Sequence, residues 1–181
     1  LVHLIARNWS IYEHQVRYHD DSPAHRGAVA PELLSGVQVG AVIEPVEYFH
    51  TLDPSHSLRE IIDVFTRTQE VILPVSDTSA ADSGKPGYSG LVLLEDIQSI
   101  LDSDETLSHL IIAEDLAVPF ASVSDSDMLA DALEVFQKTE YPELPVVNDQ
   151  GEIIGFLEQE RLFNEYYRAY LRLEAPKRHT L

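Results

Sequence analysis

Short apolar runs and helical stripes of apolar residues alternate along this chain, and the same arrangement occurs twice. In the second half, the β-branched and apolar runs 144–147 and 153–157 flank Asn148–Gly151, whose residue types favour a tight turn. The first half carries matching runs at 71–77 and 90–96. The pattern predicts two pairs of strands, and the second strand of each pair runs directly into a helix.

A helix with one apolar face is predicted before each pair of strands. Its apolar residues recur at i, i+3, i+4 and i+7, the spacing that buries one side of a helix. The first set is Leu58, Ile61, Ile62 and Phe65, and the second is Leu129, Ala132, Leu133 and Phe136. Each residue of the second set lies 71 positions after its counterpart, as Pro145 does after Pro74. Ser57 and Glu60 have the spacing of a capping box at the start of the first helix. The chain is therefore a duplicated βαββα unit.

The two copies differ in the connection between their strands. Gly155 follows Gly90 by only 65 positions, so the first copy carries six extra residues there. They fall within 78–88, a stretch rich in Ser, Asp and Gly that predicts an exposed loop tolerant of insertion. Its Gly84–Gly87 segment lacks the spacing and the hydroxyl residue of a phosphate-binding P-loop.

The segments outside the repeat predict further helices. Ser10–Glu13 has capping-box spacing, which predicts a short helix over 11–18, and Pro31–Gly36 can form one helical turn. After Asp96 a helix is predicted to reach Leu101, and the aromatic stripe over 162–171 predicts a terminal helix that packs against the domain or a second subunit. The predicted organisation is a connector (1–38), a first motif (39–101), a linker (102–109), a second motif (110–171) and a tail (172–181).

Composition narrows the possible functions. The 181 residues include 12 Lys and Arg against 31 Asp and Glu, a formal net charge of −19, which argues against nucleic acid as a partner because phosphate contacts need clustered cations. There is no cysteine, so disulfides and thiol nucleophiles are excluded, and the sequence is compatible with the cytosol. No apolar run is long enough to insert this fragment into a membrane.

Catalytic and metal-binding patterns are not evident in the sequence. The eight histidines are scattered, without the spacing of a metal site, and no serine lies in a Gly-x-Ser-x-Gly elbow. Neighbouring carboxylates are so abundant that their proximity in sequence does not indicate acid/base catalysis. We therefore expect neither a metal site nor an enzyme.

The duplicated unit resembles a tandem pair of CBS domains. The resemblance covers Val39–Leu101 and Leu110–Leu171, and it is carried by the Leu-Pro-Val strands at 73–75 and 144–146 and by the glycine strands that feed the helices. It implies an α+β (α/β-like) fold in which two βαββα motifs pack about a pseudo two-fold axis and leave two clefts. An N-terminal linker helix would precede them.

The preceding segment is similar to the connector that joins the membrane part of a prokaryotic ClC-type chloride channel or chloride/proton exchanger to its CBS pair. The matching stretches are Ser10–Glu13, Asp21–Gly27, Leu33–Leu34 and Val37–Val42. Leu1–Arg7 would then be the end of the last membrane helix, and the chain, which starts with Leu, a fragment of a longer protein. The resemblance implies a homodimeric regulatory module on the cytoplasmic face of the cell membrane, with the transmembrane ClC domain as its partner. Two alternatives are an adenylate-sensing CBS module of another protein and a dimerisation scaffold with empty clefts.

Many CBS pairs bind adenosine nucleotides, and the resemblance implies candidate positions for ATP, ADP, AMP or adenosine. The ribose carboxylate lies six residues after the strand glycine, at Asp96, and an aromatic residue lies four before the proline of the other motif, at Tyr141. The backbone from Phe120 to Ser122 would edge the base. A carboxylate can accept hydrogen bonds from ribose hydroxyls while apolar walls hold the base.

Other features argue against a nucleotide. The hydroxyl residues that the family places three positions after each glycine are replaced by Leu93 and Glu158. In the other cleft the equivalent pair would be Arg161 and Glu70, whose ion pair could fill the space. Asp96 could instead cap a helix starting at Ile97, with Tyr141 an ordinary buried ring. The acidic balance favours a neutral or singly charged adenosine compound over a triphosphate.

Overall fold

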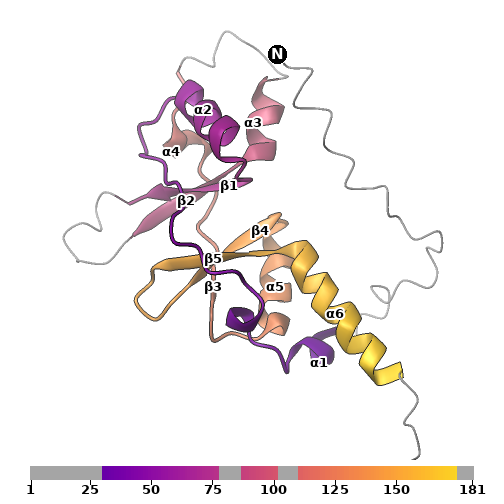
Figure 1. Cartoon of the computed structure of the whole chain (residues 1–181). Coiled ribbons are helices and arrows are strands. Elements are labelled where there is room, and N and C mark those ends of the chain that lie inside the picture. Colours follow the sequence, from indigo (N-terminus) through magenta and orange to yellow (C-terminus); the bar gives the residue numbers. More distant parts are fainter. Residues whose placement is uncertain (1–29, 78–86, 102–109, 175–181) are drawn as a thin grey trace, which may run out of the picture.

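The computed structural model describes residues 30–77, 87–101 and 110–174 and arranges them as two similar halves (Figure 1). The first half contains α2 (Leu58–Thr68), β1 (Ile72–Ser76), β2 (Tyr88–Leu93), α3 (Leu94–Leu101) and α4 (Ala113–Leu116). The second half contains β3 (Val123–Ser124), α5 (Leu129–Thr139), β4 (Glu143–Val147), β5 (Ile153–Glu158) and α6 (Gln159–Glu174). Before them come α1 (Ala30–Leu34) and the 3-10 turn η3 (Val39–Ala41). The predicted duplicated α+β architecture is confirmed.

The strand registers repeat between the halves. Strands β1 and β2 pair antiparallel with Leu73 opposite Val92, and β4 and β5 pair antiparallel with Leu144 opposite Leu157. Strand β3 runs parallel to β4. The first half has only a bridge in the equivalent place, where the Leu52 N–H donates to the Pro74 carbonyl at 2.8 Å. Each half therefore has a short parallel edge before its helix.

Helices α2 and α5 bury the predicted faces. The buried residues are Leu58, Ile61 and Phe65 in α2 and Leu129, Ala132 and Phe136 in α5. Glu60 accepts a hydrogen bond from the Ser57 N–H at 2.8 Å, as the capping pattern predicts. Both helices end on a residue in left-handed conformation, Gln69 (φ 62°) and Glu140 (φ 60°). The two ends are again 71 positions apart, so the repeat extends to the backbone.

The predicted turn between β4 and β5 is also formed. The Gly151 N–H donates to the Asn148 carbonyl at 2.9 Å, and the Asn148 side-chain oxygen accepts from the Gln150 and Glu152 N–H groups. Gly151 adopts φ 82°, a conformation that glycine tolerates without steric cost.

Each half lends an extended segment to the sheet of the other. The Val46 N–H donates to the Ile154 carbonyl of β5 at 3.0 Å, and Val118 exchanges two hydrogen bonds of 2.9 Å with Leu91 of β2. Gly90 and Gly155 lie beneath these crossings. A methyl group at Gly90 would lie 2.6 Å from the Val118 carbonyl oxygen. The strand glycines are therefore required by the close approach of backbone from the other half.

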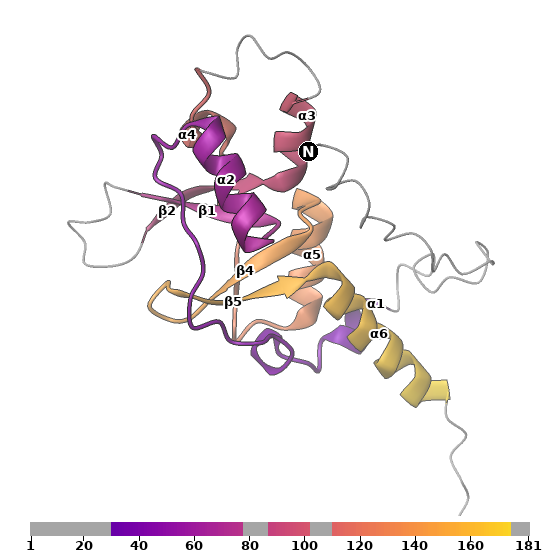
Figure 2. The same cartoon turned by 45° about the horizontal axis from the view of Figure 1, so that its top comes forward.

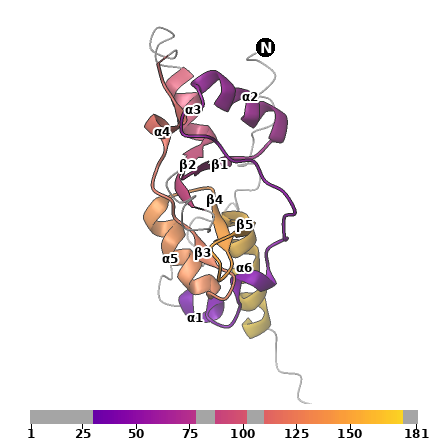
Figure 3. The ribbon, with the colours of Figure 1, turned by 90° about the vertical axis from the view of Figure 1, so that its left-hand side faces the viewer.

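The segment before the repeat packs on the second half. Leu34, Val39 and Ile43 are buried in one cluster with the second-half residues Leu129 and Phe136. A separate cluster fills the first half between α2, β1, β2 and α3. Helices α5 and α6, seen beside the β3–β4–β5 sheet in Figure 3, contact each other and bury side chains in the same cluster as Leu144 and Leu157 of that sheet. The boundary proposed between residues 38 and 39 thus falls inside a packed segment, and it stays a prediction.

Several expectations fall outside the described residues or need adjustment. The predicted helix over 11–18, most of the insertion loop, the linker and most of the tail are not among the described residues. Helix α6 runs from 159 to 174, so it is longer than predicted, and its end extends beyond the body of the molecule (Figures 1 and 2). Within the described ranges, no helix has both the length and the apolar character needed to cross a membrane.

Candidate functional site

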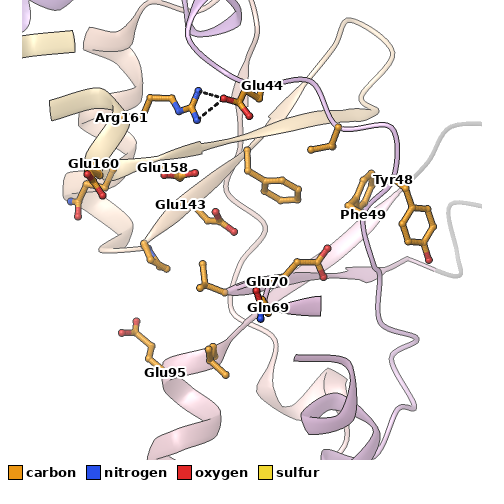
Figure 4. Close-up of a pocket in the computed structure, with 16 residues that line it drawn as sticks. Glu44, Tyr48, Phe49, Gln69, Glu70, Glu95, Glu143, Glu158, Glu160 and Arg161 are labelled. Carbon is orange, nitrogen blue, oxygen red and sulfur yellow. Dashed lines mark hydrogen bonds and ion pairs between the residues drawn. The ribbon is translucent and has the colours of Figure 1, made fainter. Parts of the chain in front are cut away.

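A cleft of about 620 Å³ opens between the two halves (Figure 4). Carboxylate side chains from both halves and from the preceding segment line it. They belong to Glu44, Glu70, Glu95, Glu143, Glu158 and Glu160. We call this cavity the acidic cleft. Its apolar walls include Phe49, Val71 and Phe156.

Glu143 and Glu158 are brought together by strand register. They are opposite each other at the ends of β4 and β5, so their side chains share one face of the sheet. In Figure 4 the Glu143 carboxylate lies between Glu158 and Glu70. Burial, together with the negative charges of Glu158 and Glu70, raises the pKa of Glu143 to about 7. The Glu143 carboxyl group therefore titrates near neutral pH.

Glu70 enters the cleft from the end of α2, directly after the left-handed Gln69. Its Oε1 accepts a hydrogen bond from the His50 N–H at 3.2 Å and lies 3.3 Å from His50 Nδ1. Its Oε2 is buried and has no hydrogen-bond partner among the described residues. Such an atom carries a desolvation cost.

Arg161 is held by the segment that crosses β5. Its Nη1 donates to the Val42 carbonyl at 2.9 Å, and its Nη2 lies 3.3 Å from Glu44 Oε1. The predicted ion pair between Arg161 and Glu70 is therefore wrong. The crossing brings Glu44 beside the start of α6, whereas Glu70 is paired with His50 instead.

The predicted nucleotide residues Asp96 and Tyr141 come together from different halves. Asp96 lies in the first turn of α3. Burial and then the nearby Asp96 carboxylate raise the pKa of Tyr141. Tyr141 is buried, and its hydroxyl donates to the Pro119 carbonyl at 3.0 Å. Neither residue lines the acidic cleft.

The alternative role for Asp96 does not hold. Helix α3 begins at Leu94, so Asp96 is a first-turn residue and not the cap of a helix that starts at Ile97. A carboxylate in this turn still interacts favourably with the positive end of the helix dipole. The reason for the difference is that β2 continues into α3 without a break, as the strand ends at Leu93.

Phe120 and Ser122 lie on the extended segment that leads from α4 to β3. The ring of Phe120 stacks on Tyr88, with centroids 5.1 Å apart and planes 18° apart. Tyr88 in turn contacts Phe49 with centroids 6.4 Å apart. Ser122 is partly exposed. These residues, with Asp96 and Tyr141, stay a predicted nucleotide site.

The sequence interpretation missed the acidic cleft. Glu143 and Glu158 occupy the outer ends of adjacent predicted strands, and pairing the strands by the Asn148–Gly151 turn would have placed them opposite each other. The contribution of Glu44 had no comparable signal, because it depends on a crossing between segments more than a hundred residues apart.

Comparison with known proteins identifies the architecture. Residues 113–168 match the family model described as CBS domain. The chloroplastic CBS domain-containing protein CBSX2 of Arabidopsis thaliana is 26% identical over 148 residues, a match that covers 70% of this chain and 62% of that protein. This chain thus spans about three fifths of the length of that curated relative.

Solved structures share the fold. The structure of CBSX2 in complex with AMP has a TM-score of 0.54 and 26% identity, covering 76% of this chain and 98% of that one. The CBS domain of a bacterial CNNM/CorC family Mg2+ transporter in complex with ATP has a TM-score of 0.59 and 17% identity, covering 80% and 98%. At that identity the second likeness concerns the fold alone.

Proposed function

We propose that this chain, which has the fold of a CBS-domain pair, is a regulatory, non-catalytic module that binds an adenosine compound beside Asp96 and Tyr141. The observation that carries the proposal is the approach of these two residues from opposite halves of the pair. A ligand held between them contacts both halves, so its binding free energy depends on the relative orientation of the halves.

The chemistry of the site suits a nucleoside. The Asp96 carboxylate can accept hydrogen bonds from two ribose hydroxyls, and the aromatic pair of Tyr88 and Phe120 supplies an apolar neighbour for a base. The AMP complex of CBSX2, which is 26% identical, supports the choice of ligand class. The net charge of −19 favours AMP or adenosine over ATP, because each added phosphate increases the repulsion.

Thermal unfolding with AMP, ADP, ATP and adenosine tests the proposal. A ligand at about 100 times its Kd should raise the Tm by about 5–10 °C. Asp96→Asn should abolish the shift, whereas Asp149→Asn, the same change in an exposed turn, should keep it. The proposal fails if none of the four compounds changes the Tm at millimolar concentration.

We further propose that the parent protein is a ClC-type chloride channel or chloride/proton exchanger, with this module homodimeric on its cytoplasmic face. The similarity of residues 10–42 to the ClC connector supports this attachment. Arg161 also fastens Val42 and Glu44 to α6, so a movement of the pair would pull on the segment that leads towards residue 1. A CBS module of another protein would have the same geometry.

The reading frame upstream of residue 1 distinguishes these two assignments. About ten hydrophobic helices encoded there would support the ClC attachment, and a different upstream domain would refute it. Chloride flux through the reconstituted full-length protein, compared with its Arg161→Ala variant, then tests regulation. We expect the variant to lose any response of flux to the adenosine ligand.

A further inference from the structure

We infer that the acidic cleft binds a small organic cation, an ammonium or sulfonium group carried on a flat apolar body, and that it rejects phosphate-bearing ligands. This site is separate from the Asp96 and Tyr141 side and does not depend on the adenosine proposal.

The cleft has an excess of negative charge that its own cations do not offset. Six carboxylates line it, and Arg161 is the one guanidinium in the same lining. The guanidinium is already engaged by Glu44 and by the Val42 carbonyl. The nearby His50 is engaged by Glu70. A cationic ligand would therefore meet carboxylates that lack a positive partner within the cleft.

The Glu70 carboxylate gives the most specific indication of a ligand. Its Oε2 is fully buried without a hydrogen-bond partner among the described residues, although the same carboxylate is bonded through Oε1. Removing a carboxylate oxygen from water without a donor is unfavourable. A positively charged group placed between Glu70 and Glu143 would offset the negative charge of Glu70 through space and that of the Glu143 carboxylate beside it (Figure 4).

The apolar walls indicate the rest of the ligand. Phe49 and Phe156 meet edge to face with centroids 6.0 Å apart, and Tyr48 lies on the same rim. Aromatic faces attract alkylated ammonium groups and pack against flat rings. A cavity of about 620 Å³ is within the range that takes drug-sized ligands. The described residues contain no group of three or more His, Asp or Glu arranged for a metal ion, which favours an organic cation over a bare one.

An anionic ligand would be opposed at the same place. A phosphate between β4 and the end of α2 would face Glu143, Glu158 and Glu70 at short range, where the low local dielectric strengthens repulsion. Charge thus opposes a phosphate-bearing ligand in the acidic cleft.

Three probes of equal body and different charge test this inference. The probes are benzyltrimethylammonium, benzyl alcohol and benzylphosphonate, titrated into the isotope-labelled chain and followed by backbone amide NMR. The titrations are run at about pH 8, above the pKa of Glu143 of about 7. We expect the ammonium probe to shift the amide signals of residues 69–71 and 143–158, the alcohol to act more weakly, and the phosphonate to leave them unchanged.

Charge-neutral variants separate this cleft from general attraction to an acidic protein. Glu143→Gln together with Glu158→Gln should weaken binding of the ammonium probe about tenfold, the loss expected for a charged contact. The single variant Glu70→Gln should also weaken binding of the ammonium probe. It keeps the test possible if the double variant does not fold. Glu114→Gln, the same change at an exposed position of α4 outside the cleft, should have no effect.

Equal binding of the ammonium and phosphonate probes, no shift with the ammonium probe at millimolar concentration, or equal losses in the cleft and control variants would each overturn the inference. Asp96→Asn should leave the ammonium probe unaffected. AMP binding that disappears in Asp96→Asn concerns the proposed function alone, so the two proposals can fail separately.

Discussion

Glu143 couples the charge of the acidic cleft to the stability of the fold. Its pKa in the folded chain is about 7, above the ordinary value of 4.5, because of burial and the adjacent Glu158 and Glu70. The folded state therefore holds this proton more tightly than the unfolded state does. The resulting contribution is fully present below about pH 4.5 and is lost as the pH rises through about 7.

Replacing Glu143 with Gln should remove this pH dependence. We expect Glu143→Gln to stabilise the chain by about 1–3 kcal/mol at pH 8 and to change little at pH 5, because only the ionised form is penalised. Urea unfolding at the two pH values measures the difference. Glu114→Gln is the control and should give the same small change at both. A stabilisation by Glu143→Gln that does not grow with pH would contradict the assignment.

Gly90 is a second residue at which one side chain matters. An added methyl group would lie 2.6 Å from the Val118 oxygen and 2.8 Å from the Ala117 Cβ, so the crossing segment must move. We expect Gly90→Ala to destabilise the chain by about 2–4 kcal/mol. Gly36→Ala is the control, because nothing lies within 4 Å of its added methyl group. If Gly90→Ala and Gly36→Ala have equal urea-unfolding midpoints, the segment at Val118 does not pack tightly on Gly90.

At the scale of elements, α6 connects the acidic cleft with the segment before the repeat. Arg161 bonds the Val42 carbonyl, and its removal should loosen the backbone over 42–46. In Arg161→Ala we expect faster hydrogen exchange at the Val46 amide, which donates to Ile154 in the native structure. Arg168→Ala removes an ion pair within α6 and should leave that amide unchanged.

The outer face of α6 carries an apolar stripe. Phe163, Tyr167 and Leu171 recur every four residues and are 47%, 56% and 47% exposed, whereas Leu162 and Tyr166 on the inner face are buried. The packing predicted for this helix thus accounts for one face only. A stripe of this kind is typical of a protein interface.

We expect a second copy of the chain to cover this stripe. Tyr167→Asp should shift sedimentation from dimer to monomer, because it places a charge in the centre of the contact. Arg172→Gln changes the net charge by the same amount at an exposed position of α6 away from the stripe, and it should leave the dimer intact. A wild-type chain that sediments as a monomer would contradict the homodimer proposal.

The elements were more predictable than their contacts. Apolar periodicity and the 71-residue repeat gave α2, α5 and both strand pairs, since local patterns decide these. The Arg161–Glu70 ion pair was wrong because Glu44 reaches Arg161 through a crossing that no local pattern encodes. The helix expected to start at Ile97 begins at Leu94 for a related reason: β2 and α3 are continuous, and no turn residue separates them.

At the scale of the whole molecule, the two halves are alike in backbone and different in chemistry. Asp96 in the first half corresponds to Arg161 in the second, and Tyr141 corresponds to Glu70. The same fold therefore presents a carboxylate beside an aromatic ring on one side and clustered carboxylates on the other. Substitutions at these equivalent positions therefore give the two halves different charges, which is the basis of the two ligand proposals.

The reciprocal crossings at Val46 and Val118 also limit how such a gene can be rearranged. Deleting either copy would remove the extended segment that bonds to the edge strand of the other copy. Backbone groups of β2 or β5 that are now hydrogen-bonded would become exposed. A single copy would have an exposed edge strand that is prone to aggregation. We therefore expect the two copies to be inherited together, because a gene that encodes one copy alone would give a less stable product.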